Sequence, residues 1–236
     1  MVEAHYDLVI LGASGFTGKY VVKEALKYLH NSISPTSPLK TIALAGRNPA
    51  KLEEALKWAL SNYHHGFENT SSSILIIKAD VSDPSSLRDL CSKTKLILNC
   101  VGPFSLYGEP VVSACIEVGC DYLDVCGEPE FMERMEAINH HKAVENGSLV
   151  ISACAFQSAI AEMVLMFHSQ QWLSPAVPNQ VEVYMSVESN KRIVVNFGSL
   201  RSSLLIVSNA EKLLELRKSR PKIATPMIPG PLLKDH

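Results

Sequence analysis

The sequence has no uninterrupted apolar run near the roughly 18 to 20 residues that a membrane-spanning helix needs. Its N-terminus carries Glu3 and Asp7 and lacks the basic start and apolar core of a secretory signal. We therefore expect a soluble, intracellular protein. Nothing in the composition excludes a peripheral association with a lipid surface.

An excess of positive charge is also missing, since 22 Lys and Arg residues face 24 Asp and Glu residues. The net charge of −2 argues against a dedicated nucleic-acid surface. The six cysteines form no C-x-x-C pair, and no group of His, Cys and carboxylate residues has the spacing of metal ligands. We expect free thiols in a reducing compartment and no metal site.

Two catalytic signatures are absent as well. No Tyr-x-x-x-Lys pair occurs, so the acid/base pair of the short-chain dehydrogenases is missing. No G-x-S-x-G elbow occurs, which argues against serine hydrolysis.

What the chain does contain is a glycine-rich turn between an apolar run and a helix. Residues 8–11 are apolar without alternation, which predicts a parallel strand buried on both faces, and residues 19–29 predict a helix. Gly12, Gly15 and Gly18 lie between them at G-x-x-G-x-x-G spacing. Such a turn allows a sharp exit from the strand, close approach of phosphate, and tight packing of the helix.

A helix start at this turn would attract an anion, because it offers unpaired N–H groups and a positive dipole end. Ser14 and Thr17 add hydroxyl donors. The turn therefore predicts a site for the pyrophosphate of a dinucleotide, against the alternative of an ordinary surface turn.

The residues that follow the second predicted strand, 41–45, bear on which dinucleotide binds. At this position an acidic residue selects a free 2′-hydroxyl and a basic residue accommodates a 2′-phosphate. The chain has Arg47 there and no neighbouring carboxylate, which favours NADP(H) over NAD(H). The alternative is a solvated arginine at a helix start.

The third strand, 74–78, is followed by Asp80, for which two interpretations stay open. Its carboxylate could accept a hydrogen bond from the adenine amino group, or it could be a turn residue. After the fourth strand, 96–101, Gly102 would admit the cofactor and Pro103 would fix the loop that follows.

Strands over 122–125 and 148–153 complete six βα units by about residue 155. This alternation predicts an α/β protein with a Rossmann-type doubly wound parallel sheet, followed by a partial α+β second domain. The predicted helices of the sheet part are 49–60 with an Asn48 cap, 110–118, and 130–146, which should turn Phe131, Met135, Ile138 and Val144 to one side.

The pattern changes after residue 155. We expect a helix over 160–170, an antiparallel strand pair over 181–188 and 193–198, and a helix over 203–216. The resulting domain boundaries are 1–155 for an NAD(P)-binding domain, 156–216 for a partial substrate domain, and 217–236 for a basic, proline-rich tail.

Five motifs together resemble one known family. GASGFTG, AGR, NCVGPF, YGEPVVSAC and YLDVCGEPEF, in this order, resemble the saccharopine dehydrogenase-like oxidoreductases, eukaryotic relatives of saccharopine reductase. The resemblance covers about residues 6–230 and implies a Rossmann domain that binds NAD(P), followed by a catalytic domain. By analogy the nucleotide site would use Gly12, Ala13, Ser14, Gly15, Phe16, Thr17, Gly18, Arg47, Asp80, Val101, Gly102 and Pro103.

The chain departs from the family pattern after the sixth strand. A G-F-D-S-I-P-like turn is replaced by residues 155–160, AFQSAI, which lack the glycine, the acidic residue and the proline. Family members also continue well beyond the proline-rich segment. Both departures are compatible with a protein that binds cofactor and turns over little.

Three residues are candidates for handling the proton of a hydride-transfer reaction. They are Tyr107 and Glu109, expected in the loop after strand four, and Glu128 after strand five. Tyr107 could instead be a packing aromatic, and both glutamates could be helix-start carboxylates.

Three classes of function follow. The first is an NADP-dependent oxidoreductase acting on a lipid-related carbonyl or enoyl group or on an amino-acid-derived imine. The second is a catalytically weak regulator that senses NADP(H), and the third is an interaction module. Expected partners are a small-molecule substrate, with a lipid surface or a second copy of the chain as further options. The family resemblance adds mitochondrial or lipid-droplet association to a cytoplasmic location.

Overall fold

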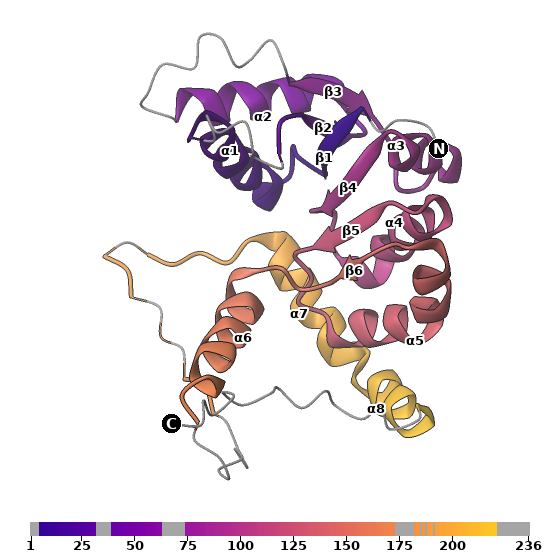
Figure 1. The fold of residues 1–236 in the computed structure, drawn as a ribbon. Coiled ribbons are helices and arrows are strands. Elements are labelled where there is room, and N and C mark those ends of the chain that lie inside the picture. The colour runs from indigo at the N-terminus through magenta and orange to yellow at the C-terminus, as the bar shows by residue number, and fades with distance from the viewer. Residues whose placement is uncertain are drawn as a thin grey trace, which may run out of the picture.

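The computed structural model describes residues 5–31, 39–62, 74–172, 182–184, 186, 188–190 and 192–220 (Figure 1). Six strands form one sheet in the order β3-β2-β1-β4-β5-β6, and every neighbouring pair is parallel. The strands are β1 Tyr6–Leu11, β2 Ile42–Gly46, β3 Leu75–Lys78, β4 Thr94–Asn99, β5 Asp121–Asp124 and β6 Val150–Ile151. This confirms the predicted Rossmann-type α/β fold.

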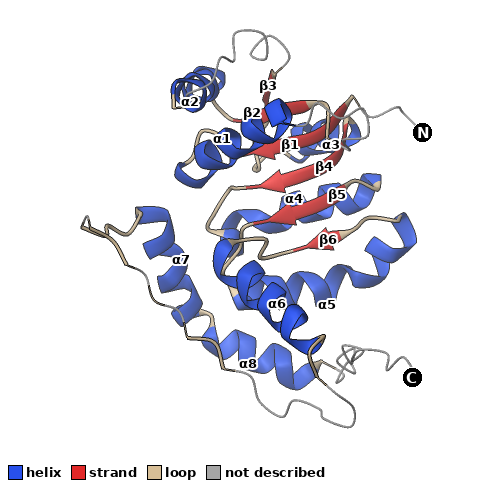
Figure 2. Ribbon diagram, turned by 60° about the vertical axis from the view of Figure 1, so that its left-hand side comes forward, coloured by secondary structure: helices blue, strands red, loops and turns tan. Residues whose placement is uncertain are grey.

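Helices alternate with the strands and then continue alone. They are α1 Phe16–Asn31, α2 Pro49–Ser61, α3 Pro84–Ser92, α4 Phe104–Val118, α5 Pro129–Asn146, α6 Phe156–Ser169, α7 Phe197–Ser208 and α8 Ala210–Ser219. The last three lie at the β6 end of the sheet, away from β3 (Figures 1 and 2).

Helices cover both faces of the sheet, and successive side chains of a strand point to opposite faces. In β1, Leu8 and Ile10 belong to the core that the α1 and α2 side chains complete. Val9 and Leu11 belong to the core that α3, α4 and α5 cover on the other face. The apolar run over residues 8–11 therefore belongs to a strand that is buried on both faces, as its lack of alternation predicted.

Helix boundaries follow local capping rules. Asn48 caps α2 by accepting a hydrogen bond from the Lys51 amide at 3.2 Å, and Pro49 takes the first helical position. Gly119 and Gly147 end α4 and α5 with φ angles of 75° and 70°, which a side chain would strain.

Two expectations about the central helices are wrong. Helix α4 begins at Phe104, so Tyr107 and Glu109 lie in its first turns and not in a loop. On α5 only part of the predicted apolar face is covered, since Ile138 and Val144 are 61% and 68% exposed. Both point away from the core to which Phe131 and Met135 belong.

The predicted antiparallel pair is also wrong over the part of that stretch that the structure describes. Residues 182–184, 186, 188–190 and 192–196 contain no strand. Instead the Asn196 side chain accepts a hydrogen bond from the Gly198 amide at 2.6 Å and starts α7. The single helix expected over 203–216 is two helices, which meet at Asn209.

The beginning of the predicted tail is part of the folded structure. Arg217 lies in the last turn of α8 and pairs with Glu133 of α5 at 2.5 Å, and Arg220, which follows the helix, pairs with Glu136 at 2.7 Å. The tail prediction is therefore wrong for residues 217–220, whereas residues 221–236 lie outside the described part. Within the described ranges no helix is both long and apolar enough to cross a bilayer.

Candidate nucleotide-binding site

The three-glycine turn lies at the carboxyl end of β1, where the strand order reverses. β2 and β3 follow on one side of β1, and β4, β5 and β6 on the other. Open α/β sheets bind their ligands in the crevice outside such a reversal point. The turn is fastened to β2 because the Gly12 amide donates to the Ala45 carbonyl at 2.8 Å.

Gly12 and Gly18 are required by the protein's own packing. Gly12 has a φ angle of 81°, and a Cβ atom there would lie 2.7 Å from Cγ2 of Val101. A Cβ atom on Gly18 would overlap the Gly12 carbonyl oxygen and lie 2.8 Å from Cα of Ala13. The turn therefore packs directly on the end of β4, which brings Gly12 and Val101 together.

Gly15 is different, because its outer side is open. It lacks a positive φ angle, and a Cβ atom would meet one atom within 4 Å, the Gly12 carbonyl oxygen at 3.2 Å. In the part of the chain that the structure describes, the amides of Ser14, Phe16 and Thr17 find no protein acceptor. Open space beside unbonded amides at a helix start fits the pyrophosphate of a dinucleotide.

Arg47 follows β2 at the same edge of the sheet. Its side chain is exposed and forms no ion pair within the described ranges, so its five N–H donors are available. The arrangement fits a 2′-phosphate of a nucleotide that lies across the strand ends.

Asp80 serves at least as a turn residue. Its Oδ1 atom accepts from the Ser82 amide at 2.9 Å, and its main-chain amide donates to the Ser86 hydroxyl at 3.0 Å. These contacts favour the turn interpretation and leave Oδ2 for a ligand.

Val101, Gly102 and Pro103 connect β4 to α4 beside the turn. The Val101 amide donates to Oδ1 of Asn99 at 2.9 Å, Gly102 is exposed, and Pro103 is buried. This segment and the glycine turn thus lie on neighbouring strand ends, as a nucleotide crossing from one half of the sheet to the other requires.

Two of the three proton-handling candidates are engaged in contacts within the protein. Glu109 is exposed and pairs with Arg134 of α5 at 2.6 Å. Glu128 is 1% exposed, and both of its oxygens accept hydrogen bonds from α4. Tyr107 is half-buried in α4, and among the described residues its hydroxyl has no hydrogen-bond partner.

The ends of β4, β5 and β6 carry a buried polar network that was not predicted from the sequence. Asp124 accepts from the Tyr122 hydroxyl at 2.9 Å, from the Ser152 hydroxyl at 3.1 Å and from the Ala153 amide at 2.8 Å. Burial raises the pKa of Asp124, although these hydrogen bonds oppose the rise. Ala153 has a φ angle of 60°, which is strained for a residue with a side chain.

A signal for this network was present in the sequence. Asn99 and Asp124 are polar residues that follow apolar residues at the carboxyl ends of β4 and β5, and they are directly paired in the sheet register. Polar residues at such positions require partners, because a buried polar group without one is costly.

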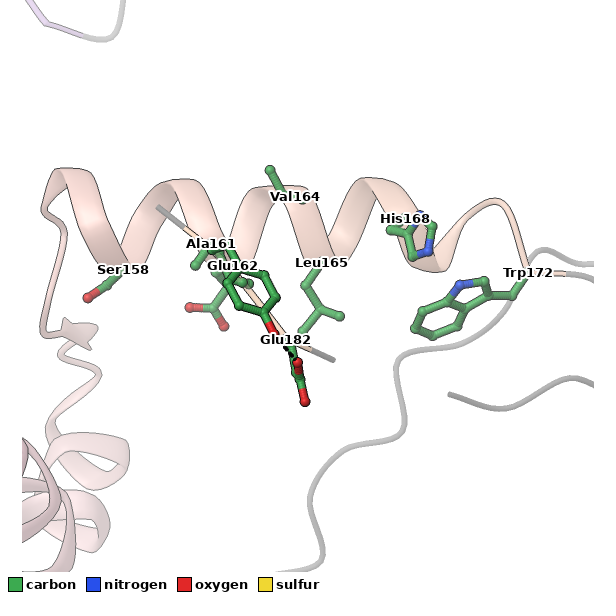
Figure 3. A pocket seen from close by; sticks show the side chains of 10 residues that line it. Ser158, Ala161, Glu162, Val164, Leu165, His168, Trp172 and Glu182 are labelled. Atoms are coloured by element: carbon green, nitrogen blue, oxygen red, sulfur yellow. Dashed lines mark hydrogen bonds between the residues drawn. The ribbon is translucent and has the colours of Figure 1, made fainter. Parts of the chain in front are cut away.

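A separate cavity of about 810 Å³ runs along α6 (Figure 3). Ser158, Glu162, Leu165 and His168 of the helix line it, and Trp172 lies at its far end, with its ring edge-on to that of His168 at 5.7 Å. Residues 182–184 form the opposite wall. None of the predicted nucleotide residues lines this cavity, but Ser158 belongs to the turn that replaces the family pattern.

No group of three or more His, Cys, Asp or Glu residues able to hold a metal ion occurs in the described part of the chain. The six cysteines are free thiols, and Cys91 and Cys115 share a hydrogen bond with 3.5 Å between their sulfur atoms.

Comparisons with known proteins identify the family of the chain. The model of the saccharopine dehydrogenase NADP-binding domain matches residues 8–151. A probable mitochondrial saccharopine dehydrogenase-like oxidoreductase of Arabidopsis thaliana is 60% identical over 98% of this chain and 50% of its own length. The saccharopine dehydrogenase-like oxidoreductase of Mus musculus is 35% identical over 90% of this chain and 48% of its own length.

A solved structure supports the fold. Apo saccharopine dehydrogenase (L-Glu forming) from Saccharomyces cerevisiae matches with a TM-score of 0.50 and 16% identity, over 70% of this chain and 30% of that one. The chain spans about half the length of the curated relatives named above. The chain belongs to the saccharopine dehydrogenase-like oxidoreductase family and carries its NADP-binding domain, which confirms the predicted family and the predicted cofactor, NADP(H).

Proposed function

We propose that the protein is an NADP(H)-dependent oxidoreductase that reduces a carbonyl, enoyl or imine group of a small molecule. The observation that carries the proposal is the open side of Gly15 next to three unbonded amides, at the reversal point of the strand order. When bound, NADPH supplies the hydride, and the reduced group takes up one proton as well.

Different residues of the chain are proposed to bind the pyrophosphate, the 2′-phosphate and the nicotinamide half of the cofactor. The amides of Ser14, Phe16 and Thr17 would hold the pyrophosphate, and the Arg47 guanidinium would donate hydrogen bonds to the 2′-phosphate. The segment from Val101 to Pro103 receives the nicotinamide half, because it follows the strand on the other side of the reversal point.

Tyr107 is our candidate for the proton donor. Glu109 is held by Arg134, and the oxygens of Glu128 are filled by α4 donors, so neither is free to exchange a proton with substrate. Tyr107→Phe should abolish turnover while leaving NADPH affinity within about twofold, since the lost hydroxyl acts only in the chemical step. Unchanged turnover would remove Tyr107 from the mechanism.

Substrate approaches from the side of α6 in this proposal. The cavity along α6 begins at Ser158, in the first turn of that helix, and its walls include apolar side chains such as Val164 and Leu165 (Figure 3). An apolar substrate with one polar group suits this lining. Ser158→Trp should fill the entrance and lower turnover without changing NADPH affinity.

The altered turn over residues 155–160 favours a second candidate function, a regulator that binds NADP(H) without turnover. Two measurements separate the alternatives. Titration with NADPH, followed by its fluorescence, tests binding, and a lack of binding would contradict both functions. Oxidation of bound NADPH in the presence of a carbonyl, enoyl and imine panel would support the enzyme, whereas binding without oxidation across the panel would support the regulator.

The name of the plant relative motivates a proposal for location. We propose that this protein also reaches mitochondria, as "mitochondrial" in that name describes the relative. Imaging of the protein fused to a fluorescent marker tests this, and exclusion from mitochondria would contradict it.

A further inference from the structure

A buried carboxylate connects three helices at the nicotinamide side of the site. Glu128 precedes the first residue of α5 and is 1% exposed. Its Oε1 atom accepts from the Phe104 amide at 2.8 Å and from the Ser202 hydroxyl at 2.8 Å. Its Oε2 atom accepts from the Ser105 amide at 2.9 Å and from the Ser105 hydroxyl.

The charge of Glu128 has no cationic partner among the described residues. Burying a carboxylate without one is expensive, because the water that solvated it is lost. Here the first turn of α4 offsets this cost, since its free amides and the positive end of its dipole face the carboxylate. Hydrogen-bond donors of the protein therefore take the place of water at both oxygens of the carboxylate.

The donors identify what the carboxylate holds in place. Phe104 and Ser105 directly follow Pro103, so fixing their amides fixes the exit of the segment that receives the nicotinamide. The Phe104 ring is packed against Phe131 with ring centroids 5.9 Å apart. Gly108 makes room for the Phe131 ring, because a Cβ atom on Gly108 would lie 2.7 Å from Cε2 of Phe131.

The fourth donor comes from outside the sheet part of the chain. Ser202 lies on α7, 74 positions after Glu128, and its hydroxyl shares Oε1 with the Phe104 amide. The same oxygen thus accepts hydrogen bonds from the first residue of α4, directly after the nicotinamide segment, and from a helix of the region that follows the sheet.

Resting on the proposed function, we infer that Glu128 is a positioning residue for the nicotinamide half of the cofactor, and that Ser202 couples α7 to it. The carboxylate sets the conformation of residues 101–105 through the α4 amides, and the position of α7 is transmitted to this segment through the shared oxygen. Glu128 neither touches the pyrophosphate site nor exchanges a proton with substrate.

The test compares two ligands that share one half. Adenosine 2′,5′-bisphosphate occupies the adenosine side alone, whereas NADPH also requires the nicotinamide segment. Both are titrated against the whole chain and against Glu128→Gln, Ser105→Ala and Ser202→Ala. The matched controls are Glu145→Gln on the exposed end of α5 and Ser203→Ala, whose hydroxyl bonds only within α7.

We expect Glu128→Gln to weaken NADPH binding about tenfold, because an amide group turned toward N–H donors loses at least one hydrogen bond to a charged acceptor. Ser202→Ala should weaken it by about threefold, as the loss of one hydroxyl donor predicts. Bisphosphate affinity should stay within twofold in both, and the fluorescence maximum of bound NADPH should shift, since the ring environment changes.

An equal loss of affinity for NADPH and for adenosine 2′,5′-bisphosphate would overturn the inference, because it would indicate a general loss of structure. Unchanged NADPH affinity in all three variants would overturn it as well. If Glu128→Gln does not fold, Ser105→Ala and Ser202→Ala decide the question. If the unmodified chain binds neither ligand, the proposed function fails, and the inference fails with it.

Discussion

Asn99 and Asp124 stand opposite each other on β4 and β5 and are joined through the hydroxyl of Tyr122. The Asn99 side-chain amide donates to this hydroxyl at 3.2 Å, and the hydroxyl donates to Asp124 at 2.9 Å. All three side chains are fully buried. A chain of polar contacts therefore crosses the end of an otherwise apolar sheet next to the proposed nicotinamide segment.

Removal of the central hydroxyl should destabilise the fold. Tyr122→Phe leaves Asp124 with one donor fewer and Asn99 without its acceptor, both away from water. We expect the free energy of unfolding to fall by about 1 to 3 kcal/mol, measured by urea denaturation. Tyr184→Phe, at a side chain that is 89% exposed, is the control and should change little. Equal stability of the two variants would contradict the proposed importance of the network.

Acid stability should depend on Asp7, at the opposite end of β1. Partial burial raises the pKa of Asp7, but hydrogen bonds from Lys95, Lys40 and Thr41 outweigh it and hold the pKa well below 3.8. The folded state thus favours the charged carboxylate, so its contribution is complete above the unfolded pKa and is lost as the pH falls below it.

Asp7→Asn should therefore lower the melting temperature at neutral pH, and the difference from the unmodified chain should shrink below about pH 4. NADPH affinity should not change, because the residue lies at the amino end of the strand. A stability difference that is the same at all pH values would show that the carboxylate charge is not the cause.

Gly15→Val should abolish nucleotide binding while the protein remains folded. The valine side chain would occupy the open side of the turn, where only the Gly12 carbonyl is near. We expect NADPH affinity to fall by at least about a hundredfold, since the pyrophosphate can no longer reach the amides.

The matched control for this variant is Gly147→Ala at the end of α5. Its φ angle of 70° makes the change strained, at a cost of about 1 kcal/mol, but no atom of the nucleotide turn is near. Loss of binding in the control as well would attribute the effect to stability, and retained binding in Gly15→Val would place the pyrophosphate elsewhere.

Arg47→Asp should shift preference from NADPH to NADH. A carboxylate repels the 2′-phosphate and can accept a hydrogen bond from a free 2′-hydroxyl. We expect the ratio of the two dissociation constants to change by at least about tenfold, measured by fluorescence titration with each nucleotide. Arg88→Asp on α3 makes the same charge change away from the strand ends and should leave the ratio as it is.

The sheet could be predicted from the chain because most of its strands contain a short apolar run, and glycine, proline or polar residues separate these runs from the helices. The glycine turn is equally local, since Gly12 and Gly18 are required by atoms within or beside the turn. The stretch after residue 181 could not be predicted in the same way. Its alternating pattern resembles a strand, but Asn196 caps a helix instead.

Roles that depend on contacts between distant residues were the hardest to predict. Glu128 and Glu109 are both acidic residues that follow predicted strands in the sequence, and only the structure distinguishes a carboxylate that accepts hydrogen bonds from α4 from one paired with Arg134. Arg217 was expected in a tail because its neighbours are basic, yet its partner Glu133 lies 84 positions earlier. Periodicity carries no information about such pairs.

The ion pairs that join α8 to α5 should make the stability of this contact depend on ionic strength. Arg217 and Arg220 reach Glu133 and Glu136 across the surface, where dissolved ions compete for the same charges. Concentrated salt should therefore weaken the attachment of α8 to α5, whereas the apolar core of the sheet should become more stable. Thermal unfolding at high salt should then show two transitions, one for α8 and one for the sheet that carries the nucleotide-binding site.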